Sequence, residues 1–249
     1  MKSSLRKFLA FCAVMALGAM LNPAQAAAPS GVKAKVVKVV GIANYSDAQN
    51  QSGPVKQGME VTSGMTITTG PGSSVYLDLG ENQAITVKPD SQLSLDKLSI
   101  DKTGADTVVE TKLEVKKGSI LGDVKKLSAA SKFEVKTANG VAGIRGTAFH
   151  IFAVGIFRCS NGQILVLTSS GQAFTVNQGQ SLNAAAPQPT LQQLTPAETA
   201  AMVADVRELL AVVVVITREP VGSPTGPSTE EVITAALSAT LGITVVPDN

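Results

Sequence analysis

The stretch FEVKTANGVAGIRGTAFHIF, residues 133–152, decides the fold of this chain. At its start, Phe133 and Val135 are each followed by a charged residue, and this period of two is typical of a half-buried β-strand. The pair Asn139-Gly140 predicts a turn, because both residue types tolerate positive φ. We therefore expect a strand, a glycine-rich turn and a second strand.

Two further glycines, Gly143 and Gly146, bracket Ile144-Arg145 and predict a close approach of two backbones. From Thr147 the sequence becomes apolar and β-favouring again. The alternation of a strand then divides the side chains between two faces, with Phe149, Ile151 and Ala153 on one and Ala148, His150 and Phe152 on the other.

Short β elements at regular spacing precede this stretch. Residues 57–100 alternate apolar and polar side chains in runs of about four to six, separated by Gly, Pro, Asn and Asp. This spacing predicts a mainly β fold with many short strands in a solenoid-like or sandwich architecture, and the tight turns favour the solenoid. Expected strands include residues 33–40, 65–68, 75–79, 85–87, 93–95, 107–115, 119–124, 157–159, 163–167 and 173–176.

The connections between these strands are also predicted. Residues 45–53 are polar and rich in turn formers, which indicates a loop. Residues 107–115 and 119–124 are expected to pair through a turn at Lys116-Lys117-Gly118. Asn161-Gly162 and Ser169-Ser170-Gly171 are expected to form hairpin turns.

The order of these motifs resembles the FecR domain, the family named for the ferric-citrate regulator of sigma-factor signalling. An apolar strand ends in Thr137, a Gly-Thr-x-Phe step follows, and a Gly-Gln pair closes the domain at Gly179. The resemblance covers about residues 57–183. Its motif residues, for which the family implies a structural or an interaction role, are Thr137, Gly143, Arg145, Gly146, Thr147, Phe149 and Gly179.

The resemblance implies a fold and a class of function. Proteins that resemble FecR relay a signal from an outer-membrane receptor to a cytoplasmic sigma factor, with a cytoplasmic anti-sigma segment and one transmembrane helix before the periplasmic domain. Neither of these two preceding segments is expected here, so only the extracytoplasmic domain carries over.

Residues 1–26 have the pattern of a signal peptide. Three basic residues precede the uncharged apolar run 8–21, and the segment ends in Ala24-Gln25-Ala26. A retained membrane anchor is the rival reading, although the run is short for a bilayer span. Cys12 does not indicate lipidation, because Phe11 precedes it. We expect an exported chain, periplasmic or secreted from a bacterium, without an integral membrane span in its mature form.

Cleavage changes the bulk properties. The chain has 21 Lys and Arg against 19 Asp and Glu, and removal of three basic residues leaves 18 against 19. This balance does not favour nucleic-acid binding, which needs a clustered positive surface. The lysines of residues 112–132 are interleaved with acids, so we interpret them as a solvated strand face that protects an edge, and attraction of an acidic partner is the alternative.

The mature chain divides into a β domain over residues 27–186 and a linker with a helical tail over residues 187–249. Thr195-Pro196-Ala197-Glu198 matches a capping box and predicts a first helix from Pro196 to about Val215. A second short helix is expected from about Ser228 to Leu241. Both are expected to pack on the β domain or on a partner.

The residues that carry chemistry are few. His150 is the only histidine, and no Gly-x-Ser-x-Gly motif, phosphate-binding loop or metal-ligand spacing accompanies it, so we interpret it as a structural strand residue. Cys159 is the only cysteine after cleavage, and we expect it to be buried. Arg145 is expected to bind a carboxylate or, if buried, to tie its turn to an acid or a carbonyl.

Two hypotheses about function follow, and neither involves catalysis, a cofactor or a metal. The first is an exported binding or regulatory module of the cell envelope that contacts another protein, a receptor or signalling component, through a strand edge or the helical tail. The second is an envelope protein that binds cell wall or glycan. The low aromatic content, 4%, and the absence of Trp weigh against the second.

Overall fold

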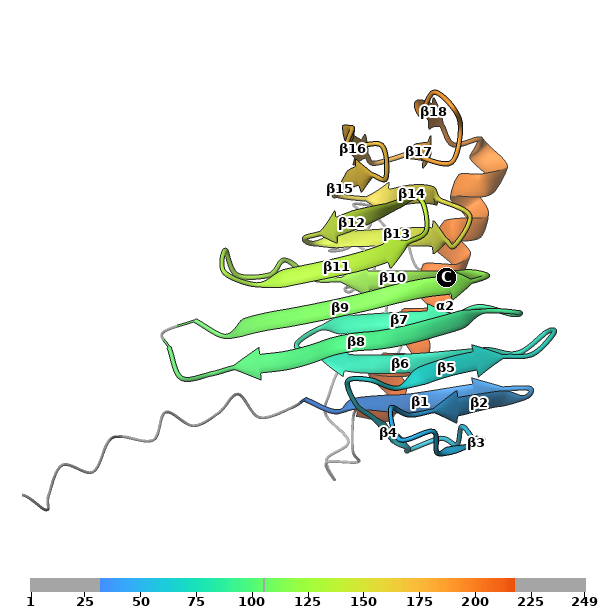
Figure 1. Cartoon of the computed structure of the whole chain (residues 1–249), viewed down its shortest axis with the longest axis vertical. Coiled ribbons are helices and arrows are strands. Elements are labelled where there is room, and N and C mark those ends of the chain that lie inside the picture. The colour runs from blue at the N-terminus through green and yellow to red at the C-terminus, as the bar shows by residue number, and fades with distance from the viewer. Residues whose placement is uncertain (1–31, 105, 218–249) are drawn as a thin grey trace, which may run out of the picture. The chain divides into compact units, whose positions relative to one another are not determined.

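The computed structural model describes residues 32–104 and 106–217 and has a mainly β fold. Its strands form two nine-stranded sheets, with one helix beside them (Figure 1). Sheet I contains β1 (Ala34–Val40), β4 (Glu60–Val61), β6 (Ser74–Gly80), β7 (Gln83–Val87), β10 (Ser119–Val124), β13 (Thr147–Phe152), β14 (Ile156–Asn161), β17 (Gln180–Asn183) and β18 (Thr190–Gln193). Sheet II contains β2 (Ala43–Ser46), β3 (Ser52–Pro54), β5 (Thr66–Thr69), β8 (Gln92–Asp101), β9 (Val108–Lys117), β11 (Lys132–Thr137), β12 (Gly140–Ile144), β15 (Gln163–Thr168) and β16 (Ala173–Asn177).

The chain winds through these sheets progressively. After β5 it alternates between them every one or two strands, and from there on the order within each sheet follows the order in the sequence. At the other end, β4 lies beyond β1 and β3 lies beyond β2. Neighbouring strands are antiparallel except β9 and β11, which are parallel. The prediction of a mainly β architecture is confirmed, and the structure combines both expected arrangements: a two-sheet sandwich that is wound like a solenoid.

The inner faces of both sheets share one core. Phe133 of β11 and Phe149 of β13 meet across the two sheets, with ring centroids 5.9 Å apart in an edge-to-face arrangement. Both side chains are fully buried. Gly122 pairs with Phe149 in sheet I, and a Cβ built on Gly122 would lie 2.3 Å from Cζ of that ring. The missing side chain at Gly122 therefore provides the space that the Phe149 ring fills.

Glycines in the left-handed region turn the chain from one sheet to the other. Gly118 has φ of 71° between β9 and β10, and Gly162 has φ of 83° between β14 and β15. Each is packed tightly against a neighbouring corner. A Cβ on Gly118 would lie 2.7 Å from Cα of Ser91, and one on Gly162 would lie 2.4 Å from the carbonyl oxygen of Gly146. A larger residue fits neither the backbone angle nor the space.

These corners correct two predicted connections. The expected pairing of residues 107–115 with 119–124 is wrong, because the chain passes at Gly118 from β9 in sheet II to β10 in sheet I. The turn at Asn161-Gly162 is likewise not a hairpin, since it joins β14 of sheet I to β15 of sheet II. Periodicity marks each strand but does not say which sheet the strand enters.

Three segments have more regular structure than predicted. The glycine-rich stretch expected as a turn includes a strand of its own, β12, which pairs with β11 and β15. The expected loop 45–53 contributes to β2 and β3. Thr190–Gln193, expected to be linker, pairs with β17 as β18. Backbone pairing with a neighbour decides these cases, because none of the three has a clear apolar alternation.

The helix α2 (Pro196–Thr217) crosses the strands of sheet I on its outer side (Figure 1). The predicted capping box is confirmed: the Glu198 amide donates to Oγ1 of Thr195, and the Thr195 amide donates to the Glu198 carboxylate. The apolar side of the helix packs on sheet I through Met202, Val206, Leu209 and Leu210. The helix thus packs on the β domain, one of the two expected outcomes, while the leader and the second predicted helix lie outside the described residues.

Replacement of Gly122 by alanine is expected to destabilise the protein. The new methyl group would collide with a buried aromatic ring, and overpacking of a core costs about 1–3 kcal/mol. Urea unfolding of Gly122→Ala measures this loss. Gly143→Ala is the matched control, because its new Cβ would have only the Leu165 carbonyl oxygen within 4 Å, at 3.7 Å. Equal unfolding midpoints for the two variants would contradict the role given to Gly122.

Candidate functional site

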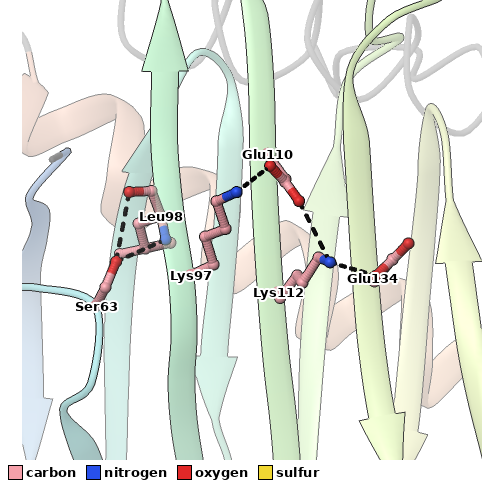
Figure 2. Close-up of polar contacts among 6 residues, drawn as sticks. All are labelled: Ser63, Lys97, Leu98, Glu110, Lys112 and Glu134. Atoms are coloured by element: carbon pink, nitrogen blue, oxygen red, sulfur yellow. Dashed lines mark hydrogen bonds and ion pairs between the residues drawn. The ribbon is translucent and has the colours of Figure 1, made fainter. Parts of the chain in front are cut away.

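The outer face of sheet II carries a ladder of paired charges over β8, β9 and β11 (Figure 2). Lys97 contacts Glu110, and Lys112 lies between Glu110 at 3.3 Å and Glu134 at 3.6 Å. Further along β9 and β11 the pattern continues, with Lys136 at 3.0 Å from Glu114. Interleaved acids therefore neutralise much of the lysine-rich segment, as the interpretation of a solvated strand face predicted. The expected protection of a sheet edge is wrong, because β9, β10 and β11 all lie inside their sheets. Exposed pairs of this kind add little stability.

Beyond the ladder the same face becomes apolar. Leu165 and Leu167 point outward from β15 and are 59% and 53% exposed, whereas Ile164 and Val166, which alternate with them, are buried in the core. Val141 of β12, which pairs with Leu167, lies partly exposed on this face. The sequence could have indicated this apolar surface, because residues 164–167 are all apolar. A strand with one face in solvent normally alternates apolar and polar residues.

A hollow of about 580 Å³ lies between the charged and apolar parts of this face. Glu134, Gly143, Leu165 and Thr175 form one row across β11, β12, β15 and β16. Gly143 contributes no side chain to this row, so the floor of the hollow lies there. Lys132 and Arg145 line the hollow as well.

Arg145 is exposed and has no hydrogen bond or ion pair with any described residue. The alternative that it ties its turn to an acid or a carbonyl applied to a buried arginine, and this one is not buried. Lys132 is exposed in the same way and pairs with no acid in the described part of the chain. Two cations are therefore available at the rim of the hollow.

The other predicted motif residues hold the fold together. Thr137 donates to the Gly140 carbonyl across the β11–β12 turn, and Thr147 donates to the Gln163 carbonyl at 2.9 Å, which links two corners. Gly146 has φ of 75° and lies against the Lys126 backbone. Gly179, with φ of 76°, donates its amide to the Cys159 carbonyl. Together with the core residue Phe149, they lie away from the hollow lining, where only Gly143 and Arg145 of the motif are found.

His150 lies on the other side of the molecule, in sheet I near α2. Its ring stacks on Phe152 with centroids 4.2 Å apart, and Nε2 lies 3.0 Å from Oγ of the buried Ser119. Burial, reinforced by the nearby charge of Lys88, lowers the pKa of His150 to about 4. The nearby acid Asp205 is engaged with Lys88 at 2.9 Å. His150 is therefore a neutral histidine on the side of sheet I that faces α2.

The remaining reactive side chains are similarly enclosed. Cys159 is fully buried, as expected, and burial raises the pKa of its thiol to about 12. Burial also raises the pKa of Asp123, which lies 3.4 Å from Lys125. Within residues 32–104 and 106–217, no three His, Cys, Asp or Glu side chains are grouped to hold a metal ion. No helix in these ranges is both long and apolar enough to cross a membrane.

The structure is therefore a wound β domain of two sheets. It contains the glycine corners and the Gly-Thr-x-Phe step on which the family resemblance rests. Residues 65–174 match the family model described as FecR protein, which confirms the predicted resemblance. The match lies within the predicted range 57–183 and includes all the predicted motif residues except Gly179.

Solved structures give a weaker comparison. Two crystal structures, at 2.50 and 1.65 Å resolution, of a protein from Parabacteroides distasonis ATCC 8503 described as a "putative anti-sigma factor" are similar to this chain. Each shares 12% identity with a TM-score of 0.44, and the alignments cover 71% and 74% of this chain and 91% and 95% of those chains. A search of curated proteins finds no significant match.

The burial of His150 predicts a dependence of stability on pH. The pKa of this residue is about 4 in the folded chain against an ordinary value of 6.5, so the unfolded chain binds the proton more readily. The contribution of the neutral ring is complete above about pH 6.5 and is lost as the pH falls toward 4, by at most about 3 kcal/mol.

Urea unfolding of the wild type and of His150→Gln between pH 7 and pH 4 tests this. Carboxyl titrations are common to both proteins, so the wild type should lose more stability over this range. Parallel curves for the two proteins would show that His150 titrates normally.

Proposed function

We propose that this protein is an exported, non-enzymatic regulatory module of the cell envelope that acts by binding another protein. The match of residues 65–174 to the FecR family model is the observation that carries this proposal, because the family resemblance implies extracytoplasmic signalling. The similar structures are also described as a regulatory protein, an anti-sigma factor. The signal-peptide pattern of residues 1–26 supports export.

The surface of sheet II supports a role in binding. α2 packs on the outer side of sheet I, whereas the outer face of sheet II has two leucines more than half exposed. Leu165 and Leu167 lie on adjacent outward positions of one strand and so form a patch that a partner protein would bury. The partly buried, neutral His150 and the buried Ser119 favour binding over catalysis.

Glycan binding is less well supported. Sugar-binding surfaces rely on exposed aromatic rings, which stack on sugars. The large apolar side chains that are exposed in the described ranges are all aliphatic: Val40, Ile42, Val154, Leu165, Leu167 and Leu191. Protein binding is therefore the better account of this face.

Export has a direct test. The full chain, produced in a bacterium with a C-terminal tag, is expected in the periplasm or the medium with Ala27 as its first residue, because signal peptidase accepts the Ala-x-Ala pattern before it. N-terminal sequencing of the fractionated protein measures this. A protein that keeps Met1 and stays in the membrane fraction would contradict export in soluble form.

Binding by the leucine patch has a second test. The exported protein is immobilised and exposed separately to envelope proteins and to purified cell wall. Leu165→Glu with Leu167→Glu is expected to weaken protein capture at least about tenfold, because a partner would then have to bury two charges. Leu191→Glu, a change at another exposed leucine, is the control and should leave capture intact. Retention on cell wall that both proteins share would favour the glycan hypothesis instead.

A further inference from the structure

The glycine at position 143 is not explained by the fold. Its backbone is not in the left-handed region, and an added Cβ would meet only the Leu165 carbonyl oxygen at an ordinary 3.7 Å. Gly140, in the same strand, differs, since its Cβ would lie 2.7 Å from the Leu167 carbonyl oxygen. A glycine also weakens a strand interior relative to residues that pack there. The space above Gly143 is therefore a feature of the surface and not a need of the backbone.

The walls of this space differ in character. Leu165 pairs with Gly143 in the neighbouring strand and is 59% exposed, so it offers an apolar wall. Glu134 pairs with Gly143 on the other side. Its carboxylate lies 3.6 Å from Lys112 and so is already partnered. A ligand side chain that entered here would bury apolar surface against Leu165.

The charge at the rim is positive. Lys132 and Arg145 line the hollow without an acidic partner among the described residues, whereas the lysines of the ladder beside it are paired. An arginine guanidinium binds a carboxylate with two parallel hydrogen bonds, and such charge-assisted bonds are stronger than neutral ones. The complementary group is a carboxylate that follows an apolar side chain.

We infer that the hollow over Gly143 receives an acidic segment of a partner protein. One apolar side chain of that segment fills the space above Gly143 against Leu165, and an adjacent carboxylate binds Arg145 and Lys132. This inference rests on the proposed protein-binding function and adds the site and the chemistry of the partner. It also gives a role to the two family-motif residues that the fold leaves free.

Three labelled ten-residue peptides test the inference with the full exported protein. Each has a central leucine in a serine and glycine background, followed by two glutamates, two glutamines or two lysines. NMR titration is expected to show the glutamate peptide shifting the amides of Gly143 and Leu165. It should bind at least about tenfold more tightly than the glutamine peptide, since charge-assisted hydrogen bonds are stronger than those between neutral groups. The lysine peptide should bind weakest.

Gly143→Val is the decisive variant. Valine suits a strand and should leave the thermal midpoint unchanged or raised, yet its side chain would fill the hollow and abolish binding of the glutamate peptide. Arg145→Ala with Lys132→Ala should remove the preference for glutamate. Lys117→Ala is the control for loss of an exposed charge, because Lys117 lies at the end of β9 that is far from Lys132, which stands beside Glu110 in the strand register.

Several outcomes would overturn the inference. They are equal affinity for the three peptides, no shift with any of them at millimolar concentration, and unchanged binding by Gly143→Val. Capture of an envelope protein that persists in Gly143→Val would place the contact elsewhere while the proposed function stands. Peptide binding without any capture from the envelope would instead leave the hollow as a site and remove the proposed function.

Discussion

The structure depends on the contact between corners where the chain passes from one sheet to the other. Because both sheets bury their inner faces in one core, each strand or hairpin must end in a crossing, and successive crossings lie against each other. Buried hydroxyls join them. The Ser91 hydroxyl accepts from the Ser119 amide at 2.9 Å and donates to the Ser119 carbonyl. The Thr69 hydroxyl accepts from the Ser91 amide and donates to the Lys88 carbonyl. A buried backbone group left unpaired at a crossing would cost about 1–3 kcal/mol, so these hydroxyls keep the crossings closed.

This construction leaves the two outer faces free to differ. On sheet I the helix covers an apolar strip, and polar contacts surround it: Arg158 with Glu198 at 2.7 Å, Lys88 with Asp205 at 2.9 Å, and the Tyr76 hydroxyl with Glu208 at 2.5 Å. Desolvation and the Glu208 carboxylate together raise the pKa of that tyrosine far above its ordinary value. Among residues 32–104 and 106–217, no helix packs on the outer face of sheet II, and this face divides into paired charges and an apolar patch. The fold thus uses the outer face of sheet I for its own helix, and the two outer faces differ in character.

The family motif has two kinds of residue that the sequence does not separate. Thr137, Gly146, Thr147 and Phe149 are accounted for by turns, corners and the core, where each has a specific hydrogen bond, backbone angle or packing contact. Arg145 has no hydrogen bond or ion pair with a described residue, and the strand pairing of Gly143 with Glu134 and Leu165 does not require a glycine.

The sequence by itself determined the class of fold, the strands of strong periodicity, the capping box of α2 and the burial of Cys159, because these follow from local alternation, turn chemistry and apolarity. The sequence also singled out Gly143 and Arg145 as candidate site residues, although only because they belong to the family motif. It did not determine that Gly118 and Gly162 change sheets instead of closing hairpins, or that β12 and β18 are strands, because those outcomes depend on partners distant in the chain. Only the tertiary structure decided that Leu165, Lys132 and Arg145 meet around the space at Gly143, since they come from three different segments that register and crossings bring to one face.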